Sequence, residues 1–524
     1  MAANESLGQD GGLLGRPGGL NVTLVTAALA LLPLVVVLKK LLFPVYDPRE
    51  PPILRPRVPF FGHVFSLISE TSEFYSDVSR EKPLPICTLP MLHGKTYVAN
   101  SPGLIAAAMR SHDISPYPSQ VEASSAVLGL PQHHVEQFTN PEVLHENGKL
   151  MATSLVKSAI KGMNTAALGH CADVLNAVQP QTALTVADGW IWIEAVMAMA
   201  AAKSLYGKRQ PMECFGISGL VVRTFDENLG LPGLNILPNL LAPKAIAARR
   251  RMTELLRPFY TERHDSNPDV AKLLKNRANY FRKRGLASEK ASSVEYLMPW
   301  AATTNTIPMM FWFFVNVFSK PEYITRIREE VLSTVEVVRT ERGDREVMVN
   351  AADLEEACPL LMACFSEVLR VHVAQTFNRR VMQDLTLEDT DGRQYLLKKG
   401  KGTNMQWSTS VTHSMPDVWG ADVAPFKPER FLNTTAQEDK QRRGVLMPFG
   451  GGRHPCPGRH FAQTEIAGFI GGMALGFDVE GVKVPSAGPP SLGAAARRPL
   501  GTLGNDEIKI SRRQGWEDVK LKFV

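Results

Sequence analysis

This chain of 524 residues contains no closely spaced pair of cysteines. Its six cysteines include no Cys-x-x-Cys pair and do not form the pattern that is typical of a small secreted domain. They stand at positions 87, 171, 214, 358, 364 and 456. The sequence therefore predicts no disulfide framework, and a reducing compartment fits it.

Internal repeats, Ser/Gly linkers and low-complexity stretches are also absent, although a chain of this length would ordinarily divide into domains of roughly 150 residues. Apolar residues make up 44% and charged residues 21%, which is the composition of an ordinary globular protein with a large core. We therefore expect one large catalytic unit. The net charge of +6 is spread along the chain, and it favours a membrane surface or an acidic partner over nucleic acid.

The N-terminal region contains a run of 19 uncharged residues, 20–38, that is long enough to span a bilayer core of roughly 30 Å. Lys39 and Lys40 follow it, which places the C-terminal side in the cytoplasm. No small-residue cleavage site follows, so an uncleaved anchor is favoured over a cleaved signal peptide. We expect residues 1–19 to be a short lumenal segment and residues 39–59 to be a stiff, proline-rich hinge before the catalytic domain, 60–524.

A second uncharged run covers 24 residues, Tyr296 to Ser319. Hydropathy alone would predict another membrane span. Four consecutive polar residues, 303–306, and the prolines at 299 and 308 interrupt the run. We therefore expect a buried helix in the core of the catalytic domain.

The segment from Phe449 to Gly458 reads FGGGRHPCPG. Its glycines allow tight turning and a close approach to a flat macrocycle, and the prolines beside Cys456 stiffen the loop. Gly458 leads into an expected helix whose N-terminus favours a thiolate. The segment resembles the cysteine loop of cytochromes P450, Phe-x-x-Gly-x-Arg-x-Cys-x-Gly, with His454 in place of arginine. The resemblance implies that Cys456 is the axial ligand of a haem b iron and that Phe449, His454 and Gly458 contact the cofactor.

A helical stretch upstream carries Glu367 and Arg370, three residues apart. Further along the chain, Arg430 is the third residue of the sequence Pro-Glu-Arg-Phe. Alone the pair is a weak signal, since an exposed ion pair is worth ~0.5 kcal/mol or less. Together with the cysteine loop, the order and spacing resemble the Glu-x-x-Arg and arginine triad of P450s. The resemblance implies a buried structural network under the haem.

The same family uses a basic residue on the strand after the Glu-x-x-Arg helix to bind a haem propionate. We assign this role to Arg380, with a solvated strand residue as the alternative, and we assign a second contact to His454. The Trp-x-x-x-Arg motif that supplies a further contact in the family is missing, and Lys149 lies in roughly that region.

Most oxygenating P450s carry Ala-Gly-x-Asp/Glu-Thr in the distal helix, whereas this chain has Thr304 at the acid position, Asn305 at the alcohol position and Thr306 next. Neither Thr304 nor Asn305 can act as a carboxylic acid, so proton delivery would need water held by Asn305 and the threonines. Asn305 could instead satisfy backbone groups at a kink caused by Pro308. The stretch resembles the sterol 7α- and 12α-hydroxylases and prostacyclin synthase.

The resemblance, over roughly residues 45–524, implies a mainly α P450 fold with a smaller β-rich part and one N-terminal transmembrane helix. It implies a monooxygenase that uses O2 and NADPH-derived electrons on a bulky apolar molecule such as a steroid or terpenoid. Expected partners are NADPH-cytochrome P450 reductase, near Lys440, Arg442, Arg443 and Arg459, and cytochrome b5. The expected location is the endoplasmic reticulum membrane, facing the cytoplasm. The alternatives are a peroxide isomerase or dehydratase and an inactive haem-binding sensor.

Overall fold

The computed structural model describes residues 47–56, 62–91, 94–129, 132–211, 219–229, 242–339, 341, 345–491, 493–501 and 507–524. Helices carry most of this structure, as the sequence predicted. The α-helices are α2 (Val64–Glu81), α3 (Pro102–Arg110), α4 (Tyr117–Leu128), α5 (Gln132–Phe138), α6 (Pro141–Ser154), α7 (Lys161–Asn176), α8 (Gly189–Tyr206), α10 (Gly219–Glu227), α13 (Pro243–Thr261), α14 (Lys272–Lys283), α15 (Ser288–Glu295), α16 (Leu297–Thr303), α17 (Thr306–Phe318), α18 (Pro321–Leu332), α19 (Leu354–Ala357), α20 (Pro359–His372), α21 (Thr409–Thr412), α22 (Pro416–Trp419), α23 (Ala436–Val445) and α24 (Arg459–Gly476).

The strands form small sheets. The largest has the order β1-β2-β10-β7-β3, and β10 pairs parallel with β2 and antiparallel with β7. Its strands are β1 (Ile86–Pro90), β2 (Lys95–Ala99), β10 (Asn404–Ser408), β7 (Thr376–Val381) and β3 (Ile114–Ser115). The others are β4 (Leu184–Val186), β11 (Phe477–Glu480) and β12 (Ile508–Arg512); β5 (Glu336–Arg339), β6 (Arg345–Val349) and β13 (Val519–Phe523); and the pair β8 (Leu385–Glu388) and β9 (Gln394–Leu397).

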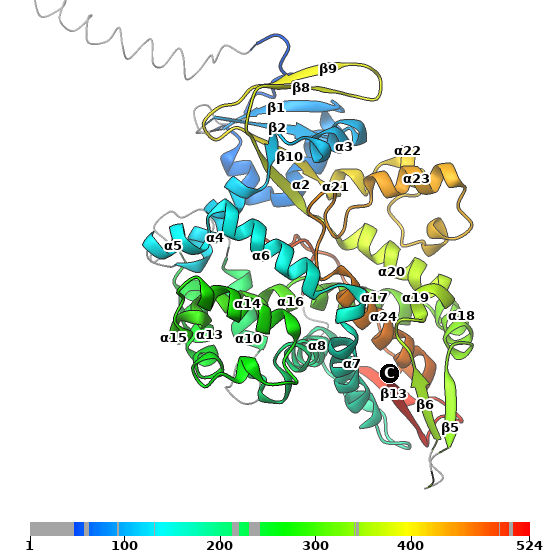
Figure 1. Cartoon of the computed structure of the whole chain (residues 1–524). Coiled ribbons are helices and arrows are strands. Elements are labelled where there is room, and N and C mark those ends of the chain that lie inside the picture. Colours follow the sequence, from blue (N-terminus) through cyan, green and yellow to red (C-terminus); the bar gives the residue numbers. More distant parts are fainter. Residues whose placement is uncertain are drawn as a thin grey trace, which may run out of the picture.

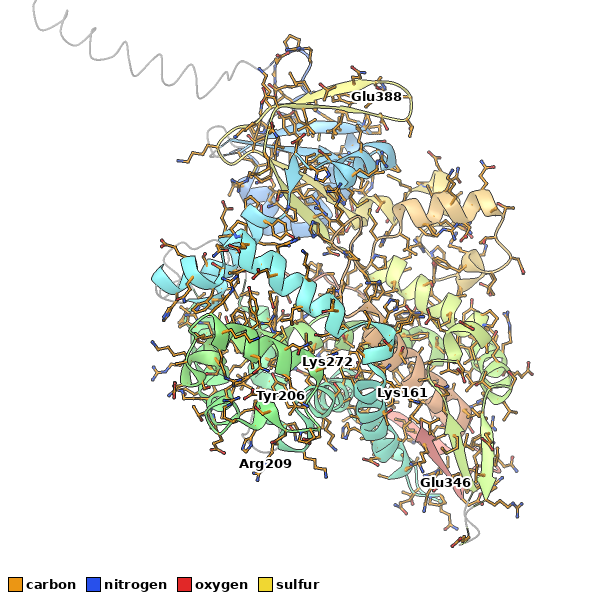
Figure 2. All side chains as sticks on the ribbon, in the orientation of Figure 1. Lys161, Tyr206, Arg209, Lys272, Glu346 and Glu388 are labelled. Atoms are coloured by element: carbon orange, nitrogen blue, oxygen red, sulfur yellow. The ribbon has the colours of Figure 1, made fainter. Side chains whose placement is uncertain are left out.

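Strands gather at both ends of the molecule, and most of the helices lie between them (Figure 1). The sheet of β1, β2 and β10 and the hairpin β8–β9 occupy one end, and Figure 2 marks that end by Glu388. Helices α17, α20 and α24 cross the middle, and β5, β6 and β13 lie at the far end, near the labelled Glu346. This arrangement confirms the mainly α architecture with smaller sheets.

The uncharged run from Tyr296 to Ser319 forms two helices of the core. Helix α16 ends at Thr303 and α17 begins at Thr306, with a turn between them. Pro308 explains the position of the break, because it has no N–H to donate to the carbonyl of Thr304. Residues 307–318 of α17 are all buried, and their apolar side chains pack against α8, α18, α20 and α24. The prediction that this run lies in the core is confirmed, but two helices stand in place of the single helix that we expected, and Ala301 is exposed.

Among the residues that the structure describes, no helix is both long enough and apolar enough to cross a membrane. The predicted anchor, 20–38, lies outside the described residues, as does the lumenal segment, 1–19. Of the predicted hinge, 39–59, only residues 47–56 are described. They lie against the large sheet: the Leu54 N–H donates to the Thr88 carbonyl at 2.9 Å, and the Thr88 N–H donates to Pro52 at 2.7 Å.

One acidic side chain lies in the apolar interior without a partner. Glu465 of α24 is 1% exposed, and neither carboxyl oxygen has a hydrogen-bond partner among the described residues. Helix α24 packs there against α7, and Cys171 of α7 lies close enough for Glu465 to act on its thiol electrostatically. Burial raises the pKa of Glu465 to about 8. The side chain is therefore protonated in the folded protein at neutral pH.

Glu465 should make the folded protein less stable as the pH rises. The folded state keeps the proton up to a pH of about 8, whereas the unfolded chain releases it above its ordinary value of 4.5. The stabilisation is therefore complete below pH 4.5 and is lost as the pH rises through 8. Relative to wild type, Glu465→Gln should gain about 3 kcal/mol of stability between pH 5 and pH 8. Thermal melts at both pH values measure this gain, and Glu480→Gln, at an exposed position of β11, should show none.

Candidate active site

The loop that carries Cys456 is held in a fixed shape by its own backbone. Gly450 and Gly452 adopt φ values of +80° and +64°, which other residues rarely adopt. The Cys456 N–H donates to the Phe449 carbonyl at 2.7 Å and closes the loop. A Cβ on Gly451 would lie 2.8 Å from Met109 Sδ, so this glycine also allows α3 to pack closely. The loop therefore holds the cysteine in a defined position.

The sulfur of Cys456 lies at the start of α24. The residue is exposed, although surrounding protein still removes enough water to raise the pKa of the thiol. The backbone N–H groups of Gly458 and Arg459 and the Arg459 charge oppose this rise, because they favour the thiolate. The cysteine therefore lies at a helix N-terminus, as the sequence predicted. An accessible sulfur that accepts N–H hydrogen bonds is suited to ligate a soft or borderline metal centre such as haem iron.

Glu367, Arg370 and Arg430 lie together as predicted. Arg370 donates two parallel hydrogen bonds to Glu367, from Nε and Nη2, both at 2.7 Å. Arg430 Nε lies 3.4 Å from Glu367 Oε1. The three residues are 0%, 3% and 7% exposed, so this is a buried network and not a surface ion pair. The guanidinium fork of Arg370 also donates to the carbonyls of His413 and Val423, which explains why lysine could not replace it.

His413 connects this network to the cysteine loop, and no sequence motif points to it. Its Nδ1 lies 3.1 Å from the Arg370 carbonyl, and its Nε2 lies 3.2 Å from the Met447 N–H, just before the loop. Because only an unprotonated nitrogen can accept from Met447, the ring is neutral with its proton on Nδ1. Burial supports this state, since it lowers the pKa of His413 to about 3. Its position at the C-cap of the short helix α21, five residues after β10, carries no distinctive sequence pattern.

A group of cationic side chains faces the cysteine loop from β7 and α6. Burial lowers the pKa of His454, and the nearby Arg379, His145 and Arg453 lower it further. Arg379 is 6% exposed and lies over the ring of Trp407, and no anion pairs with it among the described residues. Tyr117 packs edge-on against His454 and makes a 2.7 Å hydrogen bond with His145. Buried positive charge without an anion is suited to bind an acidic ligand.

Arg380 points elsewhere. Its guanidinium donates to both carboxylate oxygens of Glu122, at 3.0 and 2.9 Å, and to Asn404. Successive side chains of a strand point to opposite faces, so Arg379 and Arg380 of β7 cannot both face His454. The sequence prediction chose Arg380, whereas the geometry favours Arg379. Lys149 is exposed and lies beside Glu146, and His145 occupies the position from which α6 faces His454.

The three predicted residues of the distal helix lie at its break. Asn305 Oδ1 accepts from the N–H groups of Ala495 and Ala496, at 2.8 and 3.2 Å. It therefore satisfies backbone groups of a distant segment and not those at the kink itself, and only its NH2 group is left to hold water. Thr306 begins α17 and is half-buried. Thr304 is buried and donates to Asp226 of α10, which the sequence analysis did not single out.

Comparison with known proteins agrees with this geometry. The sequence model of the family Cytochrome P450 matches residues 51–496. A "Cytochrome P450 monooxygenase" of Gibberella zeae is 32% identical over 536 residues, covering 100% of this chain and 99% of that protein. A human "7-alpha-hydroxycholest-4-en-3-one 12-alpha-hydroxylase" is 26% identical, covering 83% of this chain and 87% of that one. The chain belongs to the cytochrome P450 family and is a P450 monooxygenase by class, with a haem-iron cofactor, as the sequence indicated.

Removing one member of the buried network should prevent the protein from assembling. Glu367→Ala leaves Arg370 as an uncompensated buried charge and leaves Arg430 with Asp422 as its anion, at a cost of about 3–5 kcal/mol. We expect little soluble, haem-loaded protein, measured as the ratio of haem to polypeptide after purification. Asp77→Ala removes half of an exposed i,i+3 pair with Arg80 and should leave that ratio unchanged. A normal haem ratio in Glu367→Ala would contradict the structural role of the network.

Proposed function

We propose that this protein binds haem b through Cys456 and hydroxylates a bulky apolar molecule with O2 and NADPH-derived electrons. The observation that carries the proposal is the pairing of two features across one site. An accessible cysteine sulfur with N–H hydrogen bonds lies on one loop, and a buried, unpaired Arg379 lies with His454 at the edge of the same loop. A haem has this combination of needs, a thiolate for its iron and cationic donors for its propionates.

The residues present fit the group. Cys456 supplies the axial sulfur, and the glycines of its loop leave room for a flat ring. We assign the propionate contacts to Arg379, His454, His145 and Tyr117, in place of Arg380 and the missing Trp-x-x-x-Arg motif. Each of them can donate a hydrogen bond, and Arg379 adds a permanent charge. The Arg380 guanidinium stabilises the packing of α4 on β7 through Glu122.

When bound, a thiolate-ligated haem supplies the activation of O2. The chain's own residues do the rest. The network of Glu367, Arg370 and His413 fixes the loop, so that the sulfur stays at one distance from the distal helix. The apolar side chains of α17 exclude water from the core beside the site. The break at Thr304 and Asn305 opens the helix where protons must arrive.

The substrate that we propose is a steroid, a terpenoid or a similar apolar metabolite. The support is similarity to proteins whose names describe steroid hydroxylation, among them the 12-alpha-hydroxylases of human and rabbit. The Gibberella relative carries only the general description of a P450 monooxygenase. These names leave the position of oxidation on the substrate open.

An isomerase or dehydratase that rearranges a peroxide is the second candidate. One observation favours it, since the distal stretch 297–318 contains no acid and Asn305 Oδ1 is occupied by Ala495 and Ala496. Such an enzyme needs neither O2 nor a reductase. Monooxygenation is the better supported function because the named relatives are monooxygenases and hydroxylases.

We further propose that residues 20–38 anchor the protein in the endoplasmic reticulum membrane, with the catalytic domain on the cytoplasmic face. NADPH-cytochrome P450 reductase would dock on the cysteine side, with cytochrome b5 as a second electron donor. Two of the basic residues that we expected to attract these partners already pair with acidic side chains, Arg443 with Asp439 and Arg442 with Glu438. Lys440 is exposed, and Arg459 lies beside the Cys456 carbonyl, so these two are the better candidates.

Turnover decides between the two functions. Purified protein with reductase and NADPH should oxidise NADPH faster when an apolar sterol or terpenoid substrate is added, and hydroxylated product should form. Cys456→His should abolish turnover, and with carbon monoxide the reduced variant should lose the absorption band of a thiolate-ligated haem. Conversion of an organic peroxide without reductase, together with no substrate-stimulated NADPH oxidation, would establish the isomerase instead.

The assignment of the propionate contact can be tested by comparing neighbours on one strand. Arg379→Ala should weaken haem retention by about tenfold or more, because it removes a buried charge-assisted contact worth about 1.5–3 kcal/mol. Arg380→Ala, which removes an exposed pair with Glu122, should change retention little. Haem transfer to apomyoglobin measures both. If Arg380→Ala loses haem more readily than Arg379→Ala, then Arg380 is the residue that binds the propionate.

A further inference from the structure

A carboxylate reaches the distal helix from another helix. The stretch 297–318 contains no Asp or Glu. Asp226, at 1% exposure on α10, accepts a hydrogen bond on Oδ1 from the Thr304 hydroxyl at 3.1 Å. The same oxygen accepts from Trp300 Nε1 at 2.7 Å. Both donors come from the distal stretch, so Asp226 contacts the position at which the helix has a threonine in place of an acid.

Asp226 is held in place from its other side as well. Its Oδ2 accepts from Arg498, which also binds Glu227 at 3.1 Å. Arg498 belongs to the C-terminal segment whose residues Ala495 and Ala496 hold Asn305. Both residues of the break, Thr304 and Asn305, are therefore tied to fixed partners. The carboxylate is aimed at the break and is not free to turn toward solvent.

A cavity connects Asp226 to further charged side chains. It lies between α8, α10 and the broken distal helix, and Tyr206, labelled in Figure 2, also lines it. The polar residues in its wall are Glu194, Arg223, Asp226, Thr303, Thr304 and Arg498. Arg223 lies 2.8 Å from Glu194, and its side chain is 24% exposed. Burial raises the pKa of Glu194, while Arg223 and Arg498 oppose that rise. The series of ionisable groups therefore runs from partly exposed to fully buried.

We propose that Asp226, supplied by α10, replaces the missing acid of the distal helix and that this cavity is the inlet through which protons reach Thr304. The proposal rests on the monooxygenase function, because that reaction consumes protons. Water in the cavity protonates Asp226. The Thr304 hydroxyl, which donates to Asp226 in this structure, turns its O–H toward the break. Protonated Asp226 then donates its proton to Thr304 Oγ1 while the hydroxyl releases its own proton into the break. Asp226 returns to the carboxylate, so one proton enters and one leaves.

The break provides the next acceptor. Pro308 has no N–H, so the carbonyl of Thr304 lacks the hydrogen bond that a continuous helix would give it. A water molecule bound to this carbonyl can receive the proton from the Thr304 hydroxyl. Asp226 acts through Thr304, so it is a proton-supplying and positioning residue and not a catalytic residue. Arg498 holds the carboxylate in register.

The experiment compares four variants of the haem-loaded full chain, assayed with reductase, NADPH and a sterol substrate. Asp226→Asn and Thr304→Val should each lower product formed per NADPH by about tenfold or more, with hydrogen peroxide making up the difference. Thr304→Ser keeps a hydroxyl and should restore coupling. Glu227→Gln is the matched control, because Glu227 also pairs with Arg498 but is half-exposed and does not contact Thr304. It should remain coupled.

Two readouts separate proton supply from simple packing. The solvent isotope effect on product formation should increase in Asp226→Asn and Thr304→Val and return to the wild-type value in Thr304→Ser. In the resting protein, without turnover, infrared spectra should show the band of the hydrogen-bonded Asp226 carboxyl group, which Asp226→Asn removes and Thr304→Val shifts. A packing role would change thermal stability alone and would leave the isotope effect and the band unchanged.

The outcomes distinguish this inference from the function on which it rests. If the wild type shows no substrate-stimulated NADPH oxidation, the monooxygenase function fails. If the wild type is coupled and both Asp226→Asn and Thr304→Val stay as coupled as Glu227→Gln, only the inlet is overturned. If Asp226→Asn does not fold, the comparison of Thr304→Val with Thr304→Ser still decides, because equal coupling in these two variants would contradict the relay.

Discussion

The buried carboxylate of Glu367 is the interaction on which the proximal half of the site depends. A fully buried charge is tolerated only where partners replace the water that it loses. Here Arg370 binds both oxygens, Arg430 approaches from the next segment, and the Lys427 N–H donates at 3.0 Å. Each partner comes with its own stretch of chain. Satisfying one carboxylate therefore fixes α20 and the segment around residues 427–430 relative to each other.

His413 extends this constraint to the reactive sulfur. It joins the last turn of α20 to Met447, from which the cysteine loop departs. The distal side is organised differently. There the helix is broken, and polar side chains of the break bind residues of α10 and of the C-terminal segment. The proximal side is thus built for rigidity around a ligand, whereas the distal side is assembled from three separate parts of the chain.

The sequence predicts those parts of the site whose residues stand close together along the chain. The cysteine loop, the Glu367–Arg370 pair and Arg430 form short motifs, and their order alone indicates the family and the mainly α fold. The buried run 296–319 could be recognised from its prolines and threonines. Arg379 could have been preferred over Arg380 only by knowing which face of β7 meets the cysteine loop, and a strand with an arginine on each face gives no such signal.

Asp226 and His413 could not be found in the same way. Asp226 lies 78 residues before Thr304, and His413 lies 43 residues after Arg370, in segments without a distinctive pattern. Both act through hydrogen bonds that exist only once distant elements pack. The membrane anchor is a different case: residues 20–38 lie outside the described structure, so its prediction stands on hydropathy alone.

The C-terminal segment 493–498 has a consequence for how the protein is made. Ala495 and Ala496 bind Asn305 across 190 and 191 residues, and Arg498 binds Asp226 across 272. Strand β13, at the very end, pairs with β6. Contacts of such long range are slow to form, because the intervening chain must first be brought together. During synthesis the distal pocket therefore stays unfinished until almost the last residue has left the ribosome, and a chain that stops early would lack the wall of its own site.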